Sequence, residues 1–175
     1  MIIYTIGHSS RGLDEFIGLL KAHGVETLAD IRKLPGSNKY PHFNQDELAA
    51  ALARAGTGYV YLKELSGRRR QNKDSPNTAW RNRSFRAYAD HMETDEFKRG
   101  VDGLLGYARE KRVALMCSEA VWWRCHRALV ADYLKAAGVT VHHIMSEAAA
   151  RPHPYTSAAK VVGDKLSYRQ RDVDG

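Results

Sequence analysis

Residues 113–144 read VALMCSEAVWWRCHRALVADYLKAAGVTVHHI. The apolar runs at 113–117 and 139–144 each predict a buried strand. Between them, residues 125–137 carry apolar side chains at helical spacing, and Gly138 marks the end of that helix. A strand, a helix and a second strand in this order predict a parallel pair joined by a right-handed crossover.

The same alternation extends toward the N-terminus. Three further apolar runs predict strands at 2–6, 25–31 and 59–62. Helical patterns begin near residues 13, 45, 84 and 94, and glycines at 24 and 56 end the first two. Asn44, with Glu47 three residues later, resembles a capping box. We therefore expect an α/β fold: a single domain, with a mostly parallel sheet of about five strands and helices on both faces.

The length of 175 residues suits one domain, which we place at residues 1–146. Residues 147–175 contain two prolines and show no clear periodicity, so we expect a loosely ordered C-terminal tail. Within that tail, residues 155–168 have the length for a small extra element.

The composition excludes several classes of protein. The apolar fraction of 43% is ordinary for a globular chain and excludes a disordered one. No apolar run reaches the roughly 18–20 residues of a membrane helix, and the N-terminus lacks a signal-peptide pattern. We therefore expect a cytoplasmic protein with no membrane partner. Two cysteines are too few for a disulfide framework, and in a reducing compartment they should be thiols.

Unusual polar residues follow the predicted strands at the same end. In an open parallel sheet, ligands bind beyond the carboxyl ends of the strands, so these residues should converge. They are Gly7–Arg11 after the first strand, Asp30 and Arg32 at the second, Glu64–Arg70 after the third, and Cys117–Arg127 after the fourth. This clustering is the main indication of a functional site.

Five short motifs lie in these segments: TIGHS at 5–9, DIR at 30–32, HFN at 42–44, LSGRR at 65–69, and CSE…CHR at 117–127. Together they resemble the DUF488 family over roughly residues 3–144. One departure is Ser66, where a second glycine is expected. The resemblance implies an α/β domain with a polar site built from these motifs. It also implies an association with removal of modified bases from DNA.

Two carboxylates are candidates for catalysis. Asp30 and Arg32 alternate along a strand and so point to the same face. Arg32 either stabilises the ionised form of a catalytic Asp30 carboxylate, or the two form a structural ion pair at the edge of the sheet. Glu119 follows a strand end at about the same level. A pair of carboxylates with divided roles is typical of glycosidic chemistry. His8 and His126 are the candidate proton donors, because the pKa of histidine lies near neutrality.

A second group of residues is expected to bind the substrate. Backbone N–H groups around His8 and Ser9 suit an anion at a strand-to-helix turn. Aromatic side chains after the second and fourth strands either pack as lids or stack on a base or sugar. The expected substrate-binding residues are Ser9, Arg32, Tyr40, Phe43, Asn44, Trp122, Cys125 and Arg127.

The cysteines allow three interpretations. Cys125, near a helix start and beside His126, suits a nucleophilic or redox thiol, although neighbours on a helix do not face each other. A zinc site would need a further ligand and a different spacing, so we expect no metal and no cofactor. Cys117 ends a buried strand and fits a packing role.

Residues 63–86 form a strongly basic segment with eight cationic and two acidic residues, a net charge of +6 within the chain's +7. Aromatics at Trp80 and Phe85 lie among the arginines, which suits contact with phosphates and bases. The alternative is a solvated, flexible loop. The expected nucleic-acid-binding residues are Arg68, Arg69, Arg70, Lys73, Arg81 and Arg83.

The leading hypothesis is a DNA N-glycosylase that removes a modified base such as 5-hydroxymethylcytosine, with DNA as the partner. The alternatives are a binding module or enzyme for a phosphorylated nucleotide or small molecule, and a thiol-dependent enzyme centred on Cys125. The sequence leaves open whether Lys33 or Lys63 forms a covalent intermediate with an opened sugar.

Overall fold

A computed structural model describes residues 1–36, 39–67 and 69–170, and it contains a six-stranded sheet in the order β3-β2-β4-β1-β5-β6. Five of the strands run parallel, and only the short β6 pairs antiparallel, with β5. The predicted fold class is therefore confirmed. The strands are β1 (Ile2–Gly7), β2 (Thr27–Asp30), β3 (Gly58–Tyr61), β4 (Val113–Cys117), β5 (Thr140–His143) and β6 (Arg151–Pro152).

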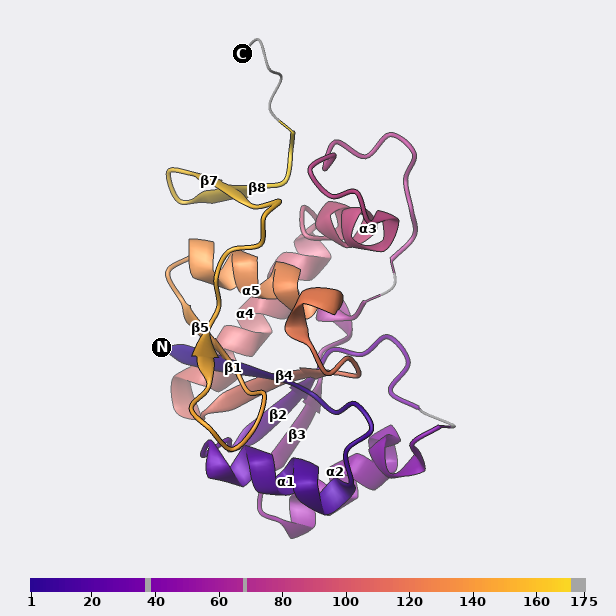
Figure 1. The fold of residues 1–175 in the computed structure, drawn as a ribbon, viewed down its shortest axis with the longest axis vertical. Coiled ribbons are helices and arrows are strands. Elements are labelled where there is room, and N and C mark those ends of the chain that lie inside the picture. The colour runs from indigo at the N-terminus through magenta and orange to yellow at the C-terminus, as the bar shows by residue number, and fades with distance from the viewer. Residues whose placement is uncertain (37–38, 68, 171–175) are drawn as a thin grey trace.

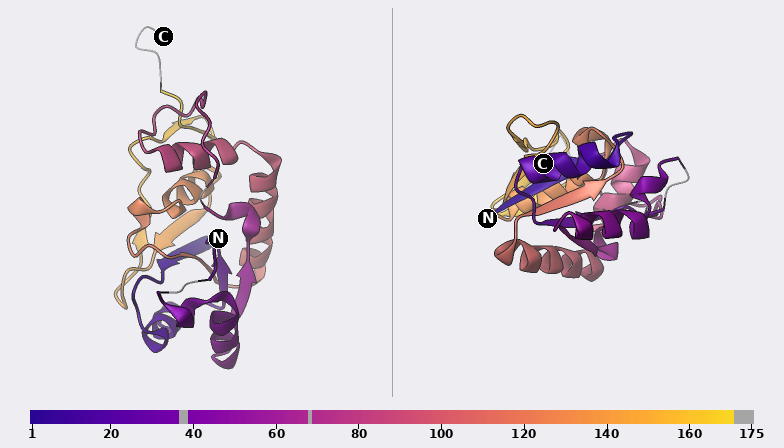
Figure 2. Two further views of the ribbon diagram at one scale, coloured as in Figure 1. Left: turned by 90° about the vertical axis from the view of Figure 1, so that its right-hand side faces the viewer. Right: turned by 90° about the horizontal axis from the view of Figure 1, so that it is seen from below.

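Helices cover both faces of the sheet (Figures 1 and 2). One face carries α1 (Leu13–Ala22) and α2 (Gln45–Arg54), and the other carries α4 (Asp95–Glu110) and α5 (Arg127–Ala136). The helix α3 (Arg83–His91) packs beyond α5. Short 3-10 helices are η1 (Pro41–Phe43), η2 (Lys63–Leu65) and η3 (Trp122–Arg124). Within the described ranges, no helix has the length and apolar character to cross a membrane.

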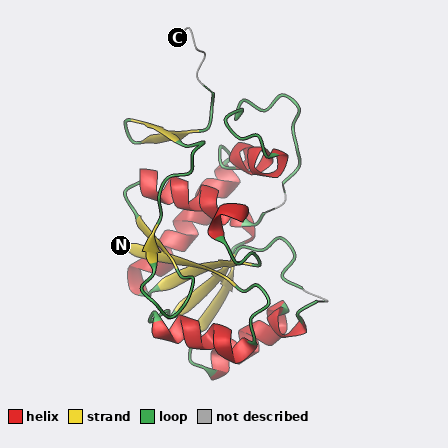
Figure 3. Cartoon of the chain, viewed as in Figure 1, coloured by secondary structure: helices red, strands yellow, loops and turns green. Residues whose placement is uncertain are grey.

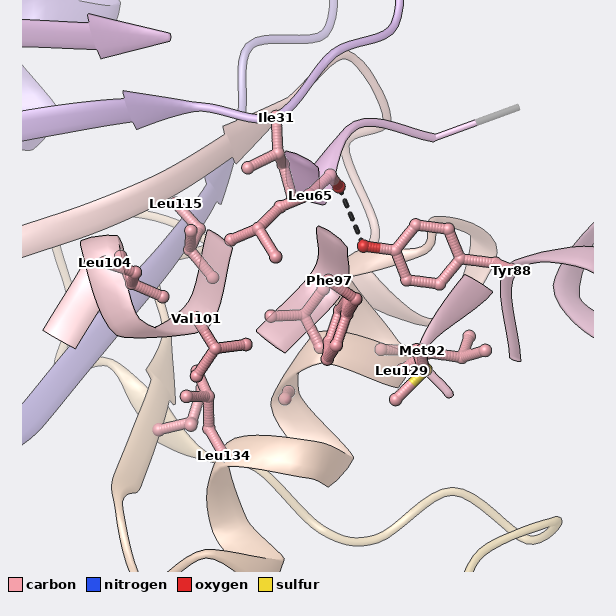
Figure 4. Close-up of a cluster of buried hydrophobic side chains, with 14 of the residues drawn as sticks. Ile31, Leu65, Tyr88, Met92, Phe97, Val101, Leu104, Leu115, Leu129 and Leu134 are labelled. Carbon is pink, nitrogen blue, oxygen red and sulfur yellow. Dashed lines mark hydrogen bonds between the residues drawn. The ribbon is translucent and has the colours of Figure 1, made fainter. Parts of the chain in front are cut away.

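The central strand β4 explains why the sheet is buried on both faces. All five of its residues are buried, and their side chains alternate between two apolar clusters. Leu115 faces the cluster formed with α4 and α5, whereas Met116 faces the cluster formed with α1 and α2. Figure 4 shows part of the first cluster, where the Tyr88 hydroxyl donates a hydrogen bond of 2.7 Å to the Leu65 carbonyl.

Side chains cap the starts of two helices, but not the start at which a capping box was predicted. Thr94 and Asn82 accept hydrogen bonds from backbone N–H groups in the first turns of α4 and α3. Asn44 occupies the N-cap position of α2, but its side chain accepts no capping hydrogen bond. The predicted capping box is therefore wrong. The segment Pro41–Phe43 forms η1 directly before Asn44 and sets the entry of the chain into α2.

The expected loose tail is wrong for residues 151–168. This segment adds β6 to the sheet and then forms a two-stranded hairpin, β7 (Lys160–Val162) and β8 (Lys165–Ser167), shown in Figure 3. The hairpin is the small element expected within 155–168. Ala158 and Tyr168 are buried in the cluster around α5, so the segment completes that core. Periodicity did not reveal it because its strands have only two or three residues.

The strand order opens a crevice between β1 and β4. From β1 the chain passes through α1, on one face of the sheet, to β2. From β4 it passes through α5, on the opposite face, to β5. Connections that leave two adjacent parallel strands in opposite directions separate their loops and leave room for a ligand. The candidate site lies at this place.

Gly7, the last residue of β1, gives the first testable prediction. A Cβ atom built on Gly7 would lie 1.6 Å from the carbonyl oxygen of Glu119 and 3.0 Å from the Arg127 guanidinium. Because backbone blocks the space, Gly7→Ala should lower the free energy of unfolding by about 1–3 kcal/mol or more. Urea denaturation measures this change.

The matched control is Gly18→Ala within α1. Nothing lies within 4 Å of a Cβ atom there, so the substitution should raise stability by about 0.5–1 kcal/mol. Equal effects of the two substitutions would contradict the close approach at Gly7.

Candidate functional site

An open cleft of about 710 Å³ lies at the carboxyl ends of β1, β2 and β4. Residues from all three strand ends and from the start of α3 line it. The volume is within the range of small-ligand sites. Seven of the residues expected to be catalytic or substrate-binding line this cleft, namely His8, Ser9, Arg32, Tyr40, Glu119, Cys125 and His126.

The lining is strongly cationic. Arg32, Lys33, Lys39 and Arg124 contribute to it, and Glu119 is the one carboxylate among the described lining residues. Such an excess of positive charge favours an anionic ligand. Lys63, the other lysine considered for a covalent intermediate, is not among the lining residues.

Asp30 is placed differently from the expectation of a catalytic carboxylate. Its side chain is 0% exposed and does not line the cleft. Its oxygens accept hydrogen bonds from the Arg32 guanidinium, the closest at 2.8 Å, and from the Tyr59 hydroxyl at 2.6 Å. The carboxylate is saturated with donors, so it orients Arg32 and cannot reach a substrate.

His8 is held as a rigid neutral ring. It stacks on Phe43 at 4.3 Å between ring centroids, and Nδ1 lies 2.8 Å from the Ser9 carbonyl, to which it donates. Nε2 then accepts from the Arg32 guanidinium at 3.5 Å. Burial lowers the pKa of His8 to about 4. The predicted role as a proton donor disagrees with this geometry, because the one ring proton is already engaged.

The turn after β1 also differs from the expected anion-binding turn. Ser9 has a φ of 50°, a left-handed conformation that side chains rarely adopt. The N–H groups of His8 and Ser9 donate to the carbonyls of Cys117 and Ser118, at 3.0 and 2.9 Å. These two donors hold the ends of β1 and β4 together and are not available to a phosphate.

His126 and Cys125 face each other, contrary to the rule for neighbours on a helix. The helix α5 begins only at Arg127, and Cys125 has extended backbone geometry, so that rule does not apply. Nε2 of His126 donates to the Ile31 carbonyl at 3.0 Å, which leaves Nδ1 as an acceptor 3.5 Å from Cys125 Sγ. Burial lowers the pKa of His126 to about 4.

The two cysteines form a pair at the cleft. Cys117 and Cys125 both line it, and their sulfurs lie in contact, although the Cα atoms are 7.4 Å apart, which is wider than the roughly 4.4–6.8 Å usual for a disulfide. The two cysteines therefore face each other across one turn of the chain. The end of β4 and the start of α5 enclose the same turn, which brings the sulfurs together. Within the described residues, no cluster of three or more potential ligands suits a metal ion.

Arg127 does not contact the cleft as predicted. It is 0% exposed, and its guanidinium donates to the Glu119 carbonyl at 2.7 Å and to the Thr5 hydroxyl at 3.2 Å. Burial lowers the pKa of Arg127 to about 9. The residue therefore fixes the backbone of the turn that presents Glu119.

Three further residues expected to bind substrate lie away from the cleft lining. Phe43 is buried beneath His8, Asn44 begins α2, and Trp122 stacks on His143 with centroids 4.6 Å apart. Trp123 remains 52% exposed. The sequence could not distinguish an aromatic side chain that packs in the core from one that contacts a ligand, because both kinds occupy the same loop positions.

The basic segment is anchored to the fold over much of its length. Trp80 packs on Phe85 and Tyr168, and Asn77 donates to Asp90 on α3 at 2.7 Å. Arg69 donates to backbone carbonyls, including that of Ser66 at 3.0 Å. Arg70, Lys73, Arg81 and Arg83 are exposed, whereas the predicted Arg68 lies outside the described residues.

Several residues that line the cleft could not be identified from the sequence. Ser84, Phe85 and Tyr88 reach the cleft from α3, and Leu34 and Lys39 reach it from the chain after β2. The available signal was the spacing of Phe85 and Tyr88, which lie three residues apart and so on one face of the helix predicted from about residue 84. It indicated only that this face packs inward, because periodicity does not distinguish a core from a cleft wall.

The buried histidines predict how stability depends on pH. The pKa values of His8, His126 and His143 are all lowered by burial in the folded state. The unfolded chain therefore binds more protons below about pH 6.5, and the free energy of unfolding should fall as the pH drops from 6.5 toward 4. Urea denaturation at several pH values measures this slope. His126→Gln should reduce it, and a flat profile would contradict the neutral rings.

Comparison with known families gives one match, and no curated protein or solved structure matches the chain. The matching family model is described as domain of unknown function DUF488, and it spans residues 12–134. That span contains the DIR, HFN, LSGRR and CSE…CHR motifs, whereas TIGHS lies just before it. Because the model covers more than half of the chain, the protein belongs to the DUF488 family.

Proposed function

We propose that this protein is a DNA N-glycosylase that removes a modified base, such as 5-hydroxymethylcytosine, from an extruded nucleotide. The observation that carries the proposal is Glu119, which is the one carboxylate among the described lining residues of a cleft that also carries four lysine and arginine side chains. A nucleotide combines a phosphate, which the cations suit, with a glycosidic bond, which a carboxylate suits.

In the proposed reaction, water replaces the base at C1′ of the sugar. The bond between C1′ and the base nitrogen breaks, the oxygen of water bonds to C1′, and the base leaves with the electron pair and then takes up a proton. Glu119 stabilises the positive charge that develops on the sugar and accepts a proton from water. His8 and His126 have their ring protons engaged, so Lys33 and Arg124 are better placed to stabilise the leaving base.

A covalent variant of the reaction is also open to this cleft. Lys33 lines it, and a lysine amine that has lost its proton can displace the base, which leaves C1′ with the electron pair of the glycosidic bond. The C1′–O4′ bond then opens, O4′ takes up a proton, and C1′ and the lysine nitrogen form a Schiff base. Borohydride trapping on modified DNA distinguishes the two routes, because only the covalent route leaves protein attached to DNA.

The exposed cations of the basic segment support DNA as the partner. Lys73 and Arg83, with Arg86, line a second hollow beside the start of α3. The same helix contributes Ser84 and Phe85 to the cleft. One helix thus lies between a basic groove suited to a phosphate backbone and a cleft suited to one nucleotide.

The test is a base-release assay on duplex and single-stranded DNA that contains 5-hydroxymethylcytosine or other modified bases. Glu119→Gln should slow release by about 100-fold or more, because it removes the charge that acts on the transition state. DNA binding should be preserved. Glu110→Gln, at the exposed end of α4, is the matched control and should leave release unchanged.

Other outcomes separate the alternatives. No base release, together with weak and salt-insensitive DNA binding, would overturn the proposal in favour of a phosphorylated nucleotide or small molecule. Affinity for DNA that falls steeply with salt, without release, would point to a binding module.

A thiol-dependent activity is the second candidate, and the placement of Cys125 favours it. Its sulfur lies 3.5 Å from the acceptor nitrogen of His126 and 3.5 Å from the Arg127 N–H at the start of α5. In the reduced protein the Arg127 N–H suits a thiolate, and the His126 nitrogen can accept a hydrogen bond from the thiol.

Alkylation of the reduced protein with iodoacetamide tests the second candidate. Cys125 should react faster than Cys117, measured by mass spectrometry in Cys117→Ser and Cys125→Ser variants. If Cys125→Ser retains full base release, thiol chemistry is excluded from that reaction.

A further inference from the structure

A buried row of polar side chains connects the Glu119 turn with the C-terminal segment. It passes from Arg127 to Thr5, His143, His153 and Asp132, and all five residues are at most 2% exposed. The residues come from α5, β1, β5 and the chain after β6. None of these five residues is among the described residues that line the cleft.

One set of protons satisfies every contact in the row. Arg127 can only donate, so the acceptor available to the Thr5 hydroxyl among its described contacts is Nδ1 of His143. Nε2 of His143 then donates to Nδ1 of His153 at 2.8 Å. Nε2 of His153 donates in turn to Asp132 at 2.8 Å. All the donors point from the cation toward the carboxylate.

The two ends of the row hold different parts of the molecule. At one end, Arg127 donates to the backbone carbonyls of Glu119 and Ala120, at 2.7 and 3.5 Å. At the other end, Asp132 accepts from the hydroxyls of Thr156 and Tyr168, both in the C-terminal segment. A displacement of the segment therefore changes the partners of Asp132, and through the row those of Arg127.

The free-energy cost of burying this row argues that the row serves to position the Glu119 turn. The buried cation and the buried carboxylate have no direct contact with each other, and desolvation of both is costly. Apolar side chains of similar volume commonly stabilise a core as well or better. A polar row does offer fixed hydrogen-bond geometry, which apolar packing does not. Trp122, which stacks on His143 and follows the Glu119 turn in the chain, adds a second contact between the row and that turn.

We propose that residues 151–168 position the Glu119 turn through this hydrogen-bonded row, so that the C-terminal segment is a working part of the cleft. The positioning residues are Thr5, His143, His153 and Asp132. Only the activity arm of the test below rests on the proposed function, because the position of the turn can be measured without any substrate.

A matched pair of threonine variants tests the proposal. Thr5→Val breaks the row at its second member, whereas Thr156→Val removes one of the hydroxyls by which the C-terminal segment holds Asp132 at the far end of the row. Hydrogen–deuterium exchange of the peptide covering residues 118–124 should become about tenfold faster in Thr5→Val. It should also become faster in Thr156→Val, by a smaller factor because the Tyr168 hydroxyl still donates to Asp132, and Thr5→Ser should restore protection. Base release should fall most in Thr5→Val and less in Thr156→Val.

Two results would overturn the proposal: unchanged exchange of residues 118–124 in Thr156→Val, or fast exchange in Thr5→Ser. Faster exchange without detectable base release, even in the unmodified protein, would support the row and reject the proposed function.

A nitrogen NMR spectrum of the unmodified protein decides the matter if Thr5→Val does not fold. His143 and His153 should both carry their proton on Nε2, and a proton on Nδ1 of either ring would contradict the row.

Discussion

The buried guanidinium of Arg127 is the interaction on which the candidate site depends. It fills the space beside Gly7, where β1 ends, and its donors hold the carbonyls of the turn after β4. The backbones of β1 and β4 could not approach so closely if Gly7 carried a side chain. The Arg127 guanidinium thus fixes the shape of the crevice at the ends of β1 and β4.

The fold could be predicted from the sequence because its signals are local. An apolar run such as 113–117 fits a strand covered on both faces, and each glycine that ends a helix acts within one turn. The C-terminal segment could not be predicted in this way. Its contribution to the core comes from isolated residues such as Ala158 and Tyr168, which contact helices distant in the sequence.

The location of the site could be predicted from the sequence, but the roles of the individual residues could not. Strand ends correctly indicated where polar residues converge, and residues such as Arg32 and Glu119 line one cleft. The sequence could not show that Asp30 is saturated by donors or that Arg127 faces the interior. Those outcomes depend on burial and hydrogen-bond partners, which arise only when distant segments pack together.

The late position of residues 151–168 in the chain has a consequence for synthesis. The residues of β1 to β5 leave the ribosome before this segment does, since a chain emerges from its N-terminus first. Until then, Asp132 lacks its contacts with Thr156 and Tyr168, and His153 has not yet joined His143. A nascent chain that has not yet made this segment therefore contains β1 to β5 but lacks the contacts that Asp132 and His143 have with the C-terminal segment.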